Sequence, residues 1–367
     1  MSDALARAVD GYERVFGRAP EAAAFAPGRV NLIGDHTDYA GGLAMPMALE
    51  AGCVAAVGPE SGRIRAAAVD LDDTHECASG SDPASWPGWA RYVIGSAQSA
   101  IDAGGCSATG LCVAVASDVP IGAGLSSSAA VEVAVVSAFE SLHGLRLDPM
   151  EKARAARRAE REFAGVPCGM LDQMAAVFGR ERHAMIIDFA GESVEHARLP
   201  DDASVLLIDT GVRHNNASGA YSALRDRAER ARAALGVEHL ARAHPETIRT
   251  LALEERAVAE HVASESERVR SFASAISSGD LRLAGSVLDA GHASLVDRLC
   301  TSVPAVDSVV DRLRRTPGVL GCRMTGAGFG GFVVALTTDR SDAPAALDGL
   351  RVRRVRAGAG CRAIVRF

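Results

Sequence analysis

Residues 111–136, LCVAVASDVPIGAGLSSSAAVEVAVV, decide the fold of the N-terminal half of the chain. The segment opens with an apolar run of strand type and closes with an apolar run of helical type. Between them lies a glycine- and serine-rich loop, in which Gly122 and Gly124 permit left-handed backbone and close approach of a ligand. We therefore predict a strand, an anion-binding loop and a helix that begins within Ser126–Ser128 and ends near Gly144.

This loop has the glycines and hydroxyls of a phosphate-binding loop, but it lacks the lysine of a Walker A sequence. Lys152 is the one lysine of the sequence, beside 38 arginines. Backbone N–H groups and the positive end of the helix dipole can together bind phosphate. The remaining positive charge would then have to come from Mg²⁺ and from an arginine elsewhere. A glycine–serine turn that only caps the helix is the structural alternative.

Composition and charge narrow the class of protein. The chain has 367 residues, of which 48% are hydrophobic, enough for two domains. Its net charge of −7 argues against a general affinity for nucleic acid. We see neither a secretion signal nor an uncharged apolar run of membrane-spanning length, and expect a cytoplasmic protein. The eight cysteines include no CxxC pair, which favours reduced thiols over disulfides or a zinc site.

Strand-like and helical patterns alternate along the chain, which indicates a mixed α and β class. Further strand-like runs lie at 184–189, 204–210 and 331–338. A helix should begin after Asp148, because an N-cap Asp followed by Pro149 is a typical helix start. We place a loose domain boundary so that residues 1–195 form the N-terminal domain and residues 196–367 the C-terminal domain.

A second informative segment, PGRVNLIGDHTDYAGG, spans residues 27–42. Its apolar residues alternate with the polar residues Arg29, Asn31, Asp35, His36 and Asp38. We expect a turn after Gly34 to present the next two side chains. Each carboxylate could accept hydrogen bonds from neighbouring sugar hydroxyls. A solvated turn is the plain alternative, and the spacing of the imidazole and the carboxylates is poor for a metal site.

Two more segments carry polar or glycine-rich patterns. In EREFAGVPCGMLDQMAAVFG (160–179), Asp172 lies among apolar residues, where a carboxylate is costly unless it is paired. We expect an arginine partner for it, and a helix N-cap is the alternative. In RMTGAGFGGFVVALTT (323–338), four glycines precede a strand, which suggests a tight loop against a ligand or another backbone.

Together these segments resemble the GHMP kinases and, within them, the galactokinase family. GRVNLIGDHTDY is similar to the galactokinase signature, PIGAGLSSSAA to the ATP-binding loop and GAGFGG to the third motif of the superfamily. Further similarity follows the order of the family through FAGVPCGMLDQ, VRHNNASGAYSALR and HVASESERV. The resemblance therefore covers nearly the whole chain.

The resemblance implies an α+β GHMP kinase fold of two domains. The N-terminal domain would resemble the second domain of ribosomal protein S5, and the C-terminal domain would be ferredoxin-like. The implied reaction is ATP-dependent phosphorylation of the anomeric hydroxyl of α-D-galactose, with Mg²⁺ as the metal. We expect the sugar and ATP as partners, a monomer, and no nucleic acid, membrane or partner chain.

The resemblance also implies roles for individual residues. Arg29 would stabilise the transition state, and Asp172 would act either as the base or as the anion that orients the hydroxyl. Ser128 and Glu160 would hold Mg²⁺. The implied sugar-binding residues are Asp35, His36, Asp38, Gly169 and Tyr221. The implied phosphate-binding residues are Gly122, Ala123, Gly124, Leu125, Ser126, Ser127 and Ser128.

Departures from the family pattern leave the choice of sugar open. Asp35 stands where most galactokinases have Glu, Gly219-Ala220 where Ser-Glu is usual, and Ala305 where an acidic residue is usual. A GHMP kinase that acts on another sugar or a cyclitol is therefore an alternative. A catalytically inactive sugar sensor is disfavoured because Arg29 and Asp172 are both present. A nicotinamide-binding protein is disfavoured because no GxGxxG follows the first strand.

Overall fold

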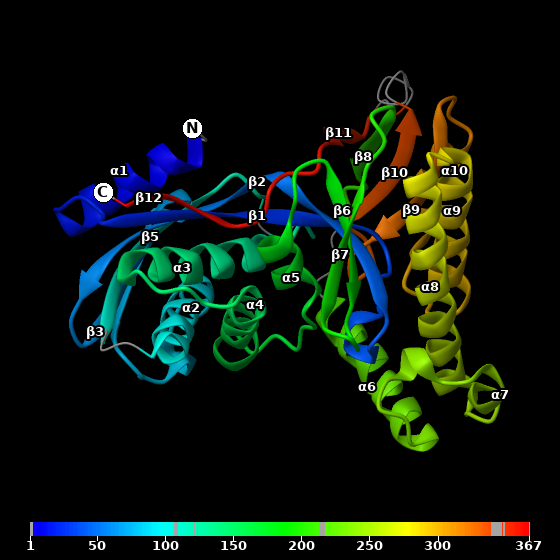
Figure 1. Ribbon diagram of the computed structural model, residues 1–367, viewed down its shortest axis with the longest axis horizontal. Coiled ribbons are helices and arrows are strands. Elements are labelled where there is room, and N and C mark those ends of the chain that lie inside the picture. The colour runs from blue at the N-terminus through cyan, green and yellow to red at the C-terminus, as the bar shows by residue number, and fades with distance from the viewer. Residues whose placement is uncertain are drawn as a thin grey trace. The chain divides into compact units, whose positions relative to one another are not determined.

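The structure is a computed structural model that describes residues 3–105, 109–120, 122, 124–212, 217–338, 347 and 349–366. It is an α+β chain with two sheets, as predicted (Figure 1). Contacts divide the chain into two compact units. Unit 1 comprises Met1–Arg29, Ala48–Glu181 and Gly358–Phe367, and unit 2 comprises Val30–Met47 and Arg182–Ala357.

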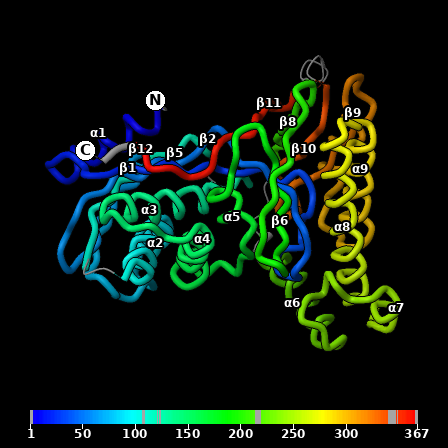
Figure 2. The backbone as a smooth tube through the Cα atoms, in the orientation of Figure 1, coloured from blue at the N-terminus to red at the C-terminus, as the bar shows by residue number. Residues whose placement is uncertain are grey.

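Unit 1 contains the sheet order β12-β1-β2-β5-β3-β4. The strands are β1 (Ala22–Ile33), β2 (Leu43–Glu60), β3 (Arg63–Ala68), β4 (Asp73–Ala78), β5 (Gly110–Ser117) and β12 (Arg362–Arg366). The helices are α1 (Asp3–Phe16), α2 (Gly88–Gly104), α3 (Ser127–His143), α4 (Pro149–Arg158), α5 (Leu171–Phe178), the π-helix η4 (Ala159–Phe163) and the 3₁₀ turns η2 (Val69–Leu71) and η3 (Pro83–Ser85). The pair β3–β5 is parallel, whereas β1–β12, β2–β5 and β3–β4 are antiparallel. The chain's last strand thus lies beside its first, which Figure 2 shows as red beside blue.

Strand β5 shows why both faces of this sheet are covered. Leu111 and Val113 face one way and pack with apolar residues of α2 and α3. Cys112 and Ala114 alternate with them and pack on the other face with α1. Because successive strand side chains point to opposite faces, an almost continuous apolar run belongs in a sheet covered on both sides.

Two helix boundaries predicted from the sequence are confirmed. Helix α3 begins at Ser127 and ends at His143, with Gly144 as a left-handed C-cap. Helix α4 begins at Pro149, and the side chain of Asp148 accepts a hydrogen bond from the backbone N–H of Met150. The helical path continues through η4 to Phe163.

Unit 2 contains a four-stranded sheet in the order β11-β8-β10-β9, in which every pairing is antiparallel. The strands of this sheet are β8 (Ala203–Asp209), β9 (Val319–Thr325), β10 (Phe332–Thr338) and β11 (Arg351–Val355). Unit 2 also contains the hairpin of β6 (His183–Asp188) and β7 (Ser193–Arg198), in which β6 pairs with β2 and so belongs to the other sheet. Its helices are α6 (Ala217–Leu235), α7 (Pro245–Ile248), α8 (Leu253–Ser278), α9 (Leu281–Asp297), α10 (Pro304–Arg314) and the 3₁₀ turns η1 (Asp38–Ala40) and η5 (Leu240–Arg242). The strands predicted at 184–189, 204–210 and 331–338 correspond to β6, β8 and β10. Apolar residues of β8, β9 and β10 pack in one core with residues of α6, α8, α9 and α10.

The compact units are not continuous in sequence. The division falls inside β1, after Arg29, and inside β2, after Met47. It also assigns the segment after Ala357 to unit 1. Compact groups of contacts are not by themselves domains that fold independently, so the boundary at 195/196 stays a prediction.

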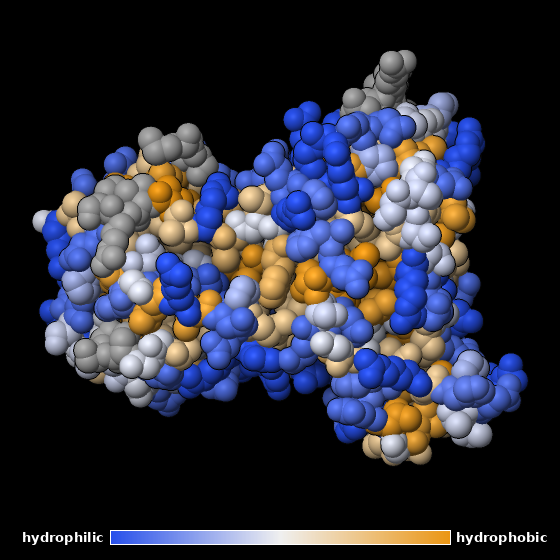
Figure 3. Space-filling model, viewed as in Figure 1, coloured by the Kyte–Doolittle hydropathy of each residue, from blue (hydrophilic) through white to orange (hydrophobic). Residues whose placement is uncertain are grey.

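Few large apolar side chains of the described residues are exposed. Hydrophilic residues dominate the face seen in Figure 3, in agreement with the charged composition. Among the described residues, the large apolar side chains that are exposed are Leu71, Leu253 and Leu283, which come from three different elements. Within the same described part of the chain, none of the helices is both long and apolar enough to cross a membrane.

Candidate active site

Unit 1 brings Arg29 and Asp172 together, although 143 positions separate them in the sequence. Arg29 extends from β1, and Asp172 lies in the first turn of α5. The guanidinium Nε donates to Asp172 Oδ1 at 2.8 Å, and Nη2 lies 2.7 Å from the same oxygen. The predicted arginine partner of Asp172 is therefore confirmed, and Met170 rather than Asp172 is the N-cap of α5.

The glycine–serine loop contacts the same ion pair. Arg29 Nη1 donates to the carbonyl oxygen of Gly124 at 2.8 Å, and the Ser126 hydroxyl donates to Asp172 Oδ2. The backbone N–H of Arg29 also donates to the carbonyl of Leu125 at 3.1 Å. This close approach requires Gly28, because a Cβ there would lie 2.6 Å from the Leu125 oxygen. Ionic and backbone contacts thus join the loop to the Arg29–Asp172 pair.

The loop has the backbone shape expected of an anion-binding turn. Gly122, Gly124 and Ser126 have φ values of 69°, 68° and 56°. Glycine adopts this left-handed region freely, whereas a serine there carries a conformational cost. Ala123 of the predicted phosphate-binding set lies outside the described residues. The described part of the loop ends at the N-terminus of α3, where the helix dipole favours an anion.

A buried cluster of acidic and amide side chains lies next along α3, η4 and α5. Glu160 Oε1 accepts a hydrogen bond from the Ser128 hydroxyl at 3.1 Å. Glu160 Oε2 accepts from Gln173 Nε2 at 2.7 Å, and the same nitrogen donates to Glu132 Oε2 at 2.9 Å. Glu132 and Gln173 are both fully buried. We call Glu132, Glu160, Asp172 and Gln173 the acidic cluster.

Burial and mutual repulsion both act on the carboxylates of this cluster. Burial raises the pKa of Glu132 well above its usual value, and the neighbouring Glu160 raises it further. Burial and the charge of Asp172 also raise the pKa of Glu160. Burial and the same two glutamates raise the pKa of Tyr92 to about 12. Burial and mutual repulsion thus both disfavour simultaneous ionisation of these carboxyl groups, and a nearby cation would relieve that cost.

The predicted metal pair, Ser128 and Glu160, fits a magnesium ion in its donor chemistry. Hydroxyl and carboxylate oxygens are the ligands that Mg²⁺ prefers, and it commonly takes few of them from the protein. The two side chains already lie within hydrogen-bond distance of one another. No group of three or more His, Cys, Asp or Glu that could hold a metal occurs in the described part of the chain. Two protein ligands together with nucleotide phosphates therefore match the residues present.

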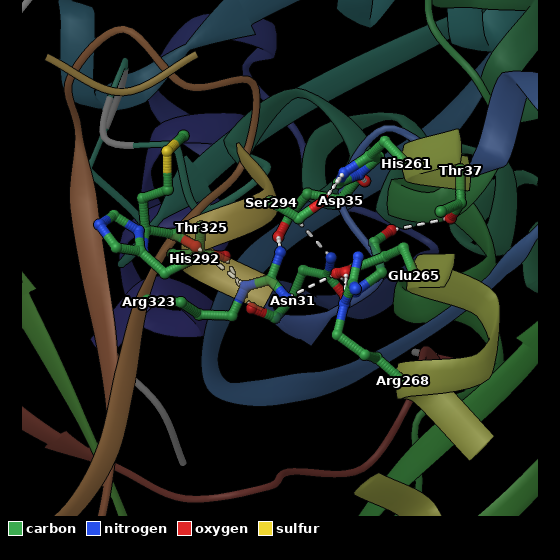
Figure 4. A network of polar contacts seen from close by, with 12 residues as sticks. Asn31, Asp35, Thr37, His261, Glu265, Arg268, His292, Ser294, Arg323 and Thr325 are labelled. Atoms are coloured by element: carbon green, nitrogen blue, oxygen red, sulfur yellow. Dashed lines mark hydrogen bonds and ion pairs between the residues drawn. The ribbon is translucent and has the colours of Figure 1, made fainter. Parts of the chain in front are cut away.

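Unit 2 contains a second buried polar network around Arg323, which is drawn in Figure 4. Arg323 extends from β9 and is fully buried. Its Nη2 donates to Asp35 Oδ2 at 2.9 Å and its Nη1 to Glu265 Oε1 at 2.5 Å. Arg268 Nε donates to Glu265 Oε2 at 2.6 Å. We call Asp35, Glu265, Arg268 and Arg323 the ion network.

Asp35 is satisfied largely by protein groups. Its Oδ1 accepts from Asn31 Nδ2 and from the backbone N–H of Gly326, both at 3.0 Å. With the Arg323 contact, three of the four acceptor positions of the carboxylate are used. Burial raises the pKa of Asp35 against the opposing charge of Arg323. Asp35 thus links the turn after Gly34 to the glycine-rich loop that follows β9.

His36 lies beside two tyrosines in the predicted turn. Its Nδ1 is 3.2 Å from the Tyr39 hydroxyl, and its ring centroid is 5.5 Å from that of Tyr221 on α6. His36 is buried, its φ is 62°, and burial lowers its pKa to about 3. The imidazole is therefore neutral near pH 7. Asp38, half-buried, begins η1 two residues later.

The remaining predicted residues fall on loops or outside the described chain. Gly169 lies in the irregular segment between η4 and α5 in unit 1. The third glycine-rich segment connects β9 and β10 in unit 2, where a Cβ on Gly328 would lie 2.6 Å from the Thr301 carbonyl. This close backbone approach confirms the tight loop predicted there. Residues 213–216 of the motif VRHNNASGAYSALR lie outside the described residues.

Comparison with known proteins agrees with this arrangement of motifs. Residues 10–59 match the galactokinase galactose-binding signature, residues 91–180 the N-terminal domain of GHMP kinases and residues 272–353 their C-terminal domain. A galactokinase of Mycobacterium bovis is 39% identical over 319 residues, which cover 85% of this chain and 87% of the relative. A galactokinase of Streptomyces coelicolor is 38% identical over 92% of this chain and 90% of the relative.

The chain belongs to the galactokinase family.

Solved structures support the same family and its fold. The galactokinase of Lactococcus lactis, crystallised with galactose, superposes with a TM-score of 0.87 at 26% identity and covers 96% of this chain and 98% of its own. Methanococcus jannaschii mevalonate kinase matches with a TM-score of 0.68 at 18% identity over 93% of this chain and 99% of its own, which shows the shared fold alone. The predicted two-domain GHMP kinase fold is confirmed. Membership of a kinase family also implies the use of ATP.

Several residues that organise this galactokinase-family chain were not predicted from its sequence. They are Glu132, Gln173, His261, Glu265 and Arg323. Glu132 carried a usable signal, because it is the one charged residue within the apolar run AAVEVAVV. Glu265 and Arg323 lie on an ordinary charged helix and on a strand, so their pairing across 58 positions is a tertiary effect.

Proposed function

We propose that the protein transfers the γ-phosphoryl group of ATP to the anomeric hydroxyl of α-D-galactose and releases galactose 1-phosphate and ADP. The observation that carries the proposal is the Arg29–Asp172 ion pair, bonded directly to the glycine–serine loop through Gly124 and Ser126. Phosphoryl transfer depends mainly on alignment and on neutralisation of charge. A guanidinium and a carboxylate fixed at a phosphate-binding loop supply both.

In unit 1, we assign phosphoryl transfer to Arg29 and Asp172. The contacts of Arg29 use three of its five N–H groups, which leaves two for phosphoryl oxygens. Asp172 Oδ2, which accepts from Ser126, is the oxygen suited to receive or orient the anomeric hydroxyl. We leave both roles of Asp172, base and orienting anion, within the proposal.

The loop from Gly122 to Ser128 would bind the phosphates of ATP through backbone N–H groups and the N-terminus of α3. Ser128 and Glu160 would hold the magnesium ion. When bound, Mg²⁺ would neutralise charge on the transferred phosphate. These assignments explain how a loop without lysine can serve a nucleotide.

We assign sugar binding to Asp35, His36, Asp38, Gly169 and Tyr221, as the family resemblance implies. The remaining acceptor position of Asp35 Oδ2 would take one sugar hydroxyl. His36 is neutral and can donate or accept a hydrogen bond, and the Tyr221 ring beside it offers an apolar face. We further propose that the protein acts in the cytoplasm as a monomer.

One observation favours a second candidate, a kinase of another sugar or cyclitol. Asp35 is shorter than the glutamate usual in galactokinases, and protein donors engage most of its carboxylate. Asp35 therefore has fewer acceptor positions for a sugar hydroxyl. This bears on which sugar is bound and not on phosphoryl transfer itself.

The test measures ADP release from Mg-ATP with galactose, 2-deoxygalactose, N-acetylgalactosamine, glucose, arabinose, galacturonate and several cyclitols. Asp172→Asn provides the blank for each compound. We expect galactose to give the highest kcat/KM, and activity in the variant to be about 10³-fold lower. Turnover of another compound without turnover of galactose would support the second candidate. If no compound stimulates ADP release by a protein that still binds ATP, both candidate functions are contradicted.

A further inference from the structure

Glu132 has a position that packing alone does not explain. It lies on α3, one turn beyond Ser128 and on the same face of the helix, and it is fully buried. Its neighbours along the helix, Val131 and Val133, pack in the apolar core of unit 1. A carboxyl group in such a place destabilises a fold unless its partners compensate. An apolar residue would serve packing better.

The only hydrogen bond found for the Glu132 side chain in the described structure is the one from Gln173 Nε2. That nitrogen carries two hydrogens, of which one bonds Glu132 Oε2 at 2.9 Å and the other Glu160 Oε2 at 2.7 Å. Glu132 Oε1 and Gln173 Oε1 are buried without a hydrogen-bond partner. The arrangement thus fixes the Gln173 amide nitrogen between two carboxylates at the expense of two unsatisfied oxygens.

We propose that Glu132 and Gln173 form a positioning pair that holds the Glu160 carboxylate in the orientation required to bind the divalent cation of the nucleotide. The inference rests on the proposed function, because it takes Glu160 as a cation ligand. Glu132 anchors the amide of Gln173, and Gln173 in turn fixes Glu160 Oε2. Glu160 Oε1 is left beside the Ser128 hydroxyl, the other predicted ligand.

The local backbone supports this role. Glu160 lies in η4, where the helix that begins as α4 widens to a π-helix. Single π turns are frequent at functional sites because they change the direction of one side chain within a helix. Gln173 follows Asp172 directly, so the residue that orients the predicted cation ligand is the chain neighbour of the predicted catalytic carboxylate. Replacing a residue that orients a metal ligand commonly weakens metal binding about 10-fold or more.

The first part of the test compares the wild type with Glu132→Met, Glu132→Gln and the control Glu140→Gln. Methionine has a similar length but offers no acceptor for the Gln173 amide. Glutamine keeps an acceptor and supplies a donor, so it preserves the arrangement. Glu140 lies on the same helix but binds Lys152 and the backbone N–H of Leu147, away from the acidic cluster. Its replacement reports on general effects of removing a carboxylate from α3.

Binding is measured by calorimetry with the non-hydrolysable nucleotide AMP-PNP, once with Mn²⁺ and once in EDTA. For Glu132→Met we expect binding with Mn²⁺ to weaken about 10-fold or more. Binding in EDTA should change less than about twofold, because the phosphate loop is intact. Glu132→Gln and Glu140→Gln should stay near the wild type in both conditions. A purely structural role would weaken binding in both conditions or in neither.

A further variant, Gln173→Met, tests the same inference if Glu132→Met does not fold. Gln173→Met should weaken AMP-PNP binding with Mn²⁺ by the same factor and leave binding in EDTA unchanged. The double variant should bind no more weakly than either single variant, because both residues act on Glu160 through the same hydrogen bonds. Wild-type affinity for Mn²⁺ and AMP-PNP in both methionine variants would overturn the inference. Absence of AMP-PNP binding by the wild type in every condition would instead overturn the proposed function, and the inference with it.

Discussion

The acidic cluster of unit 1 and the ion network of unit 2 are both buried, but they balance charge in opposite ways. In the ion network, the two carboxylates of Asp35 and Glu265 are matched by the guanidiniums of Arg323 and Arg268. In the acidic cluster, Arg29 is ion-paired with Asp172, and the two glutamates both accept a hydrogen bond from the amide nitrogen of Gln173. The carboxylates of the ion network are thus neutralised by arginines of the protein, whereas the two glutamates of the acidic cluster share a neutral amide.

The pKa values express this difference. Burial alone would raise the pKa of Glu265, but the charges of Arg323 and Arg268 outweigh it and lower the pKa to about 2. Burial raises the pKa of Glu160, and the charge of Asp172 adds to the increase. A network neutralised internally stabilises a fold and fixes the loops that it joins. Buried carboxyl groups that repel one another are stabilised as anions when a cation binds, which is the role that we propose for Glu160.

Asp172→Asn should have the largest effect on activity. The amide retains the shape of the side chain but cannot accept a proton or bear the charge that pairs with Arg29. We expect kcat for galactose to fall about 10³-fold, within the range for loss of a general base. Steady-state ADP release measures kcat, and circular dichroism confirms that the variant is folded. A loss of less than tenfold would contradict the assignment of Asp172 to the chemical step.

Arg323→Leu should have the largest effect on stability. The substitution leaves the carboxylates of Asp35 and Glu265 buried without their shared partner, which costs about 3–5 kcal/mol. Urea unfolding at pH 7.5 measures the change in the free energy of unfolding. Glu132→Gln in the acidic cluster is the matched change in unit 1, and its effect should stay within about 1 kcal/mol. Equal losses in the two variants would erase the contrast between the regions.

Acidification should act with opposite sign on His261, which lies beside the ion network, and on the glutamates of the acidic cluster. His261 is fully buried and hydrogen-bonded to Ser294 and to the carbonyl of Asp35, and burial lowers its pKa to about 4. Its contribution to stability is fully present above pH 6.5 and is lost as the pH falls toward 4, by up to about 3 kcal/mol. The raised pKa values of Glu132 and Glu160 act oppositely, because the folded state then binds more protons than the unfolded state.

The free energy of unfolding, measured in urea from pH 7.5 to 4.5, tests this expectation. Glutamine can still donate to the Asp35 carbonyl but does not titrate, so His261→Gln should reduce the loss of stability between pH 6.5 and 4.5. Glu132→Gln should instead remove stabilisation gained on acidification, and so make the loss steeper. Identical pH profiles in the wild type and both variants would show that neither region governs the acid response.

Ser126→Gly should reduce activity, but by less than Asp172→Asn does. Glycine adopts the left-handed conformation of Ser126 without strain, so the change removes the hydroxyl bonded to Asp172 and preserves the loop. We expect kcat to fall about 10-fold, since a hydrogen bond to a charged group contributes about 1.5 kcal/mol or more. Ser127→Ala is the neighbouring control and should stay within about threefold. Equal losses in both would indicate a general effect on the loop.

Local patterns predicted much of the fold. The run from 111 to 136 became β5, the loop and α3, and the Asp148-Pro149 pair capped α4 as its chemistry requires. The long strands β1 and β2 were harder to predict from the sequence. Pro27, Gly28 and several polar side chains interrupt the apolar pattern of β1, although every residue of the strand is buried. Tertiary packing overrode local preference there.

Residues of the candidate site could be predicted where the sequence places a charged side chain among apolar ones, because burying an unpaired charge is costly. Asp172 among apolar residues implied an arginine, and the structure supplies Arg29. Arg323 gave no such signal, because an arginine at the start of a motif is unremarkable until its burial is known. The space that it occupies depends on Gly291, where a Cβ would lie 2.2 Å from Arg323 Nη1. No local pattern specifies a complementarity of this kind.

The most direct test of the central claim identifies the product. The protein is incubated with galactose and Mg-ATP, and the product is examined by ³¹P NMR. We predict a phosphomonoester signal coupled to the anomeric proton of the sugar, and its absence with Asp172→Asn. A phosphate on any other hydroxyl, or no phosphorylated galactose from a protein that phosphorylates another compound of the panel, would contradict the proposed reaction.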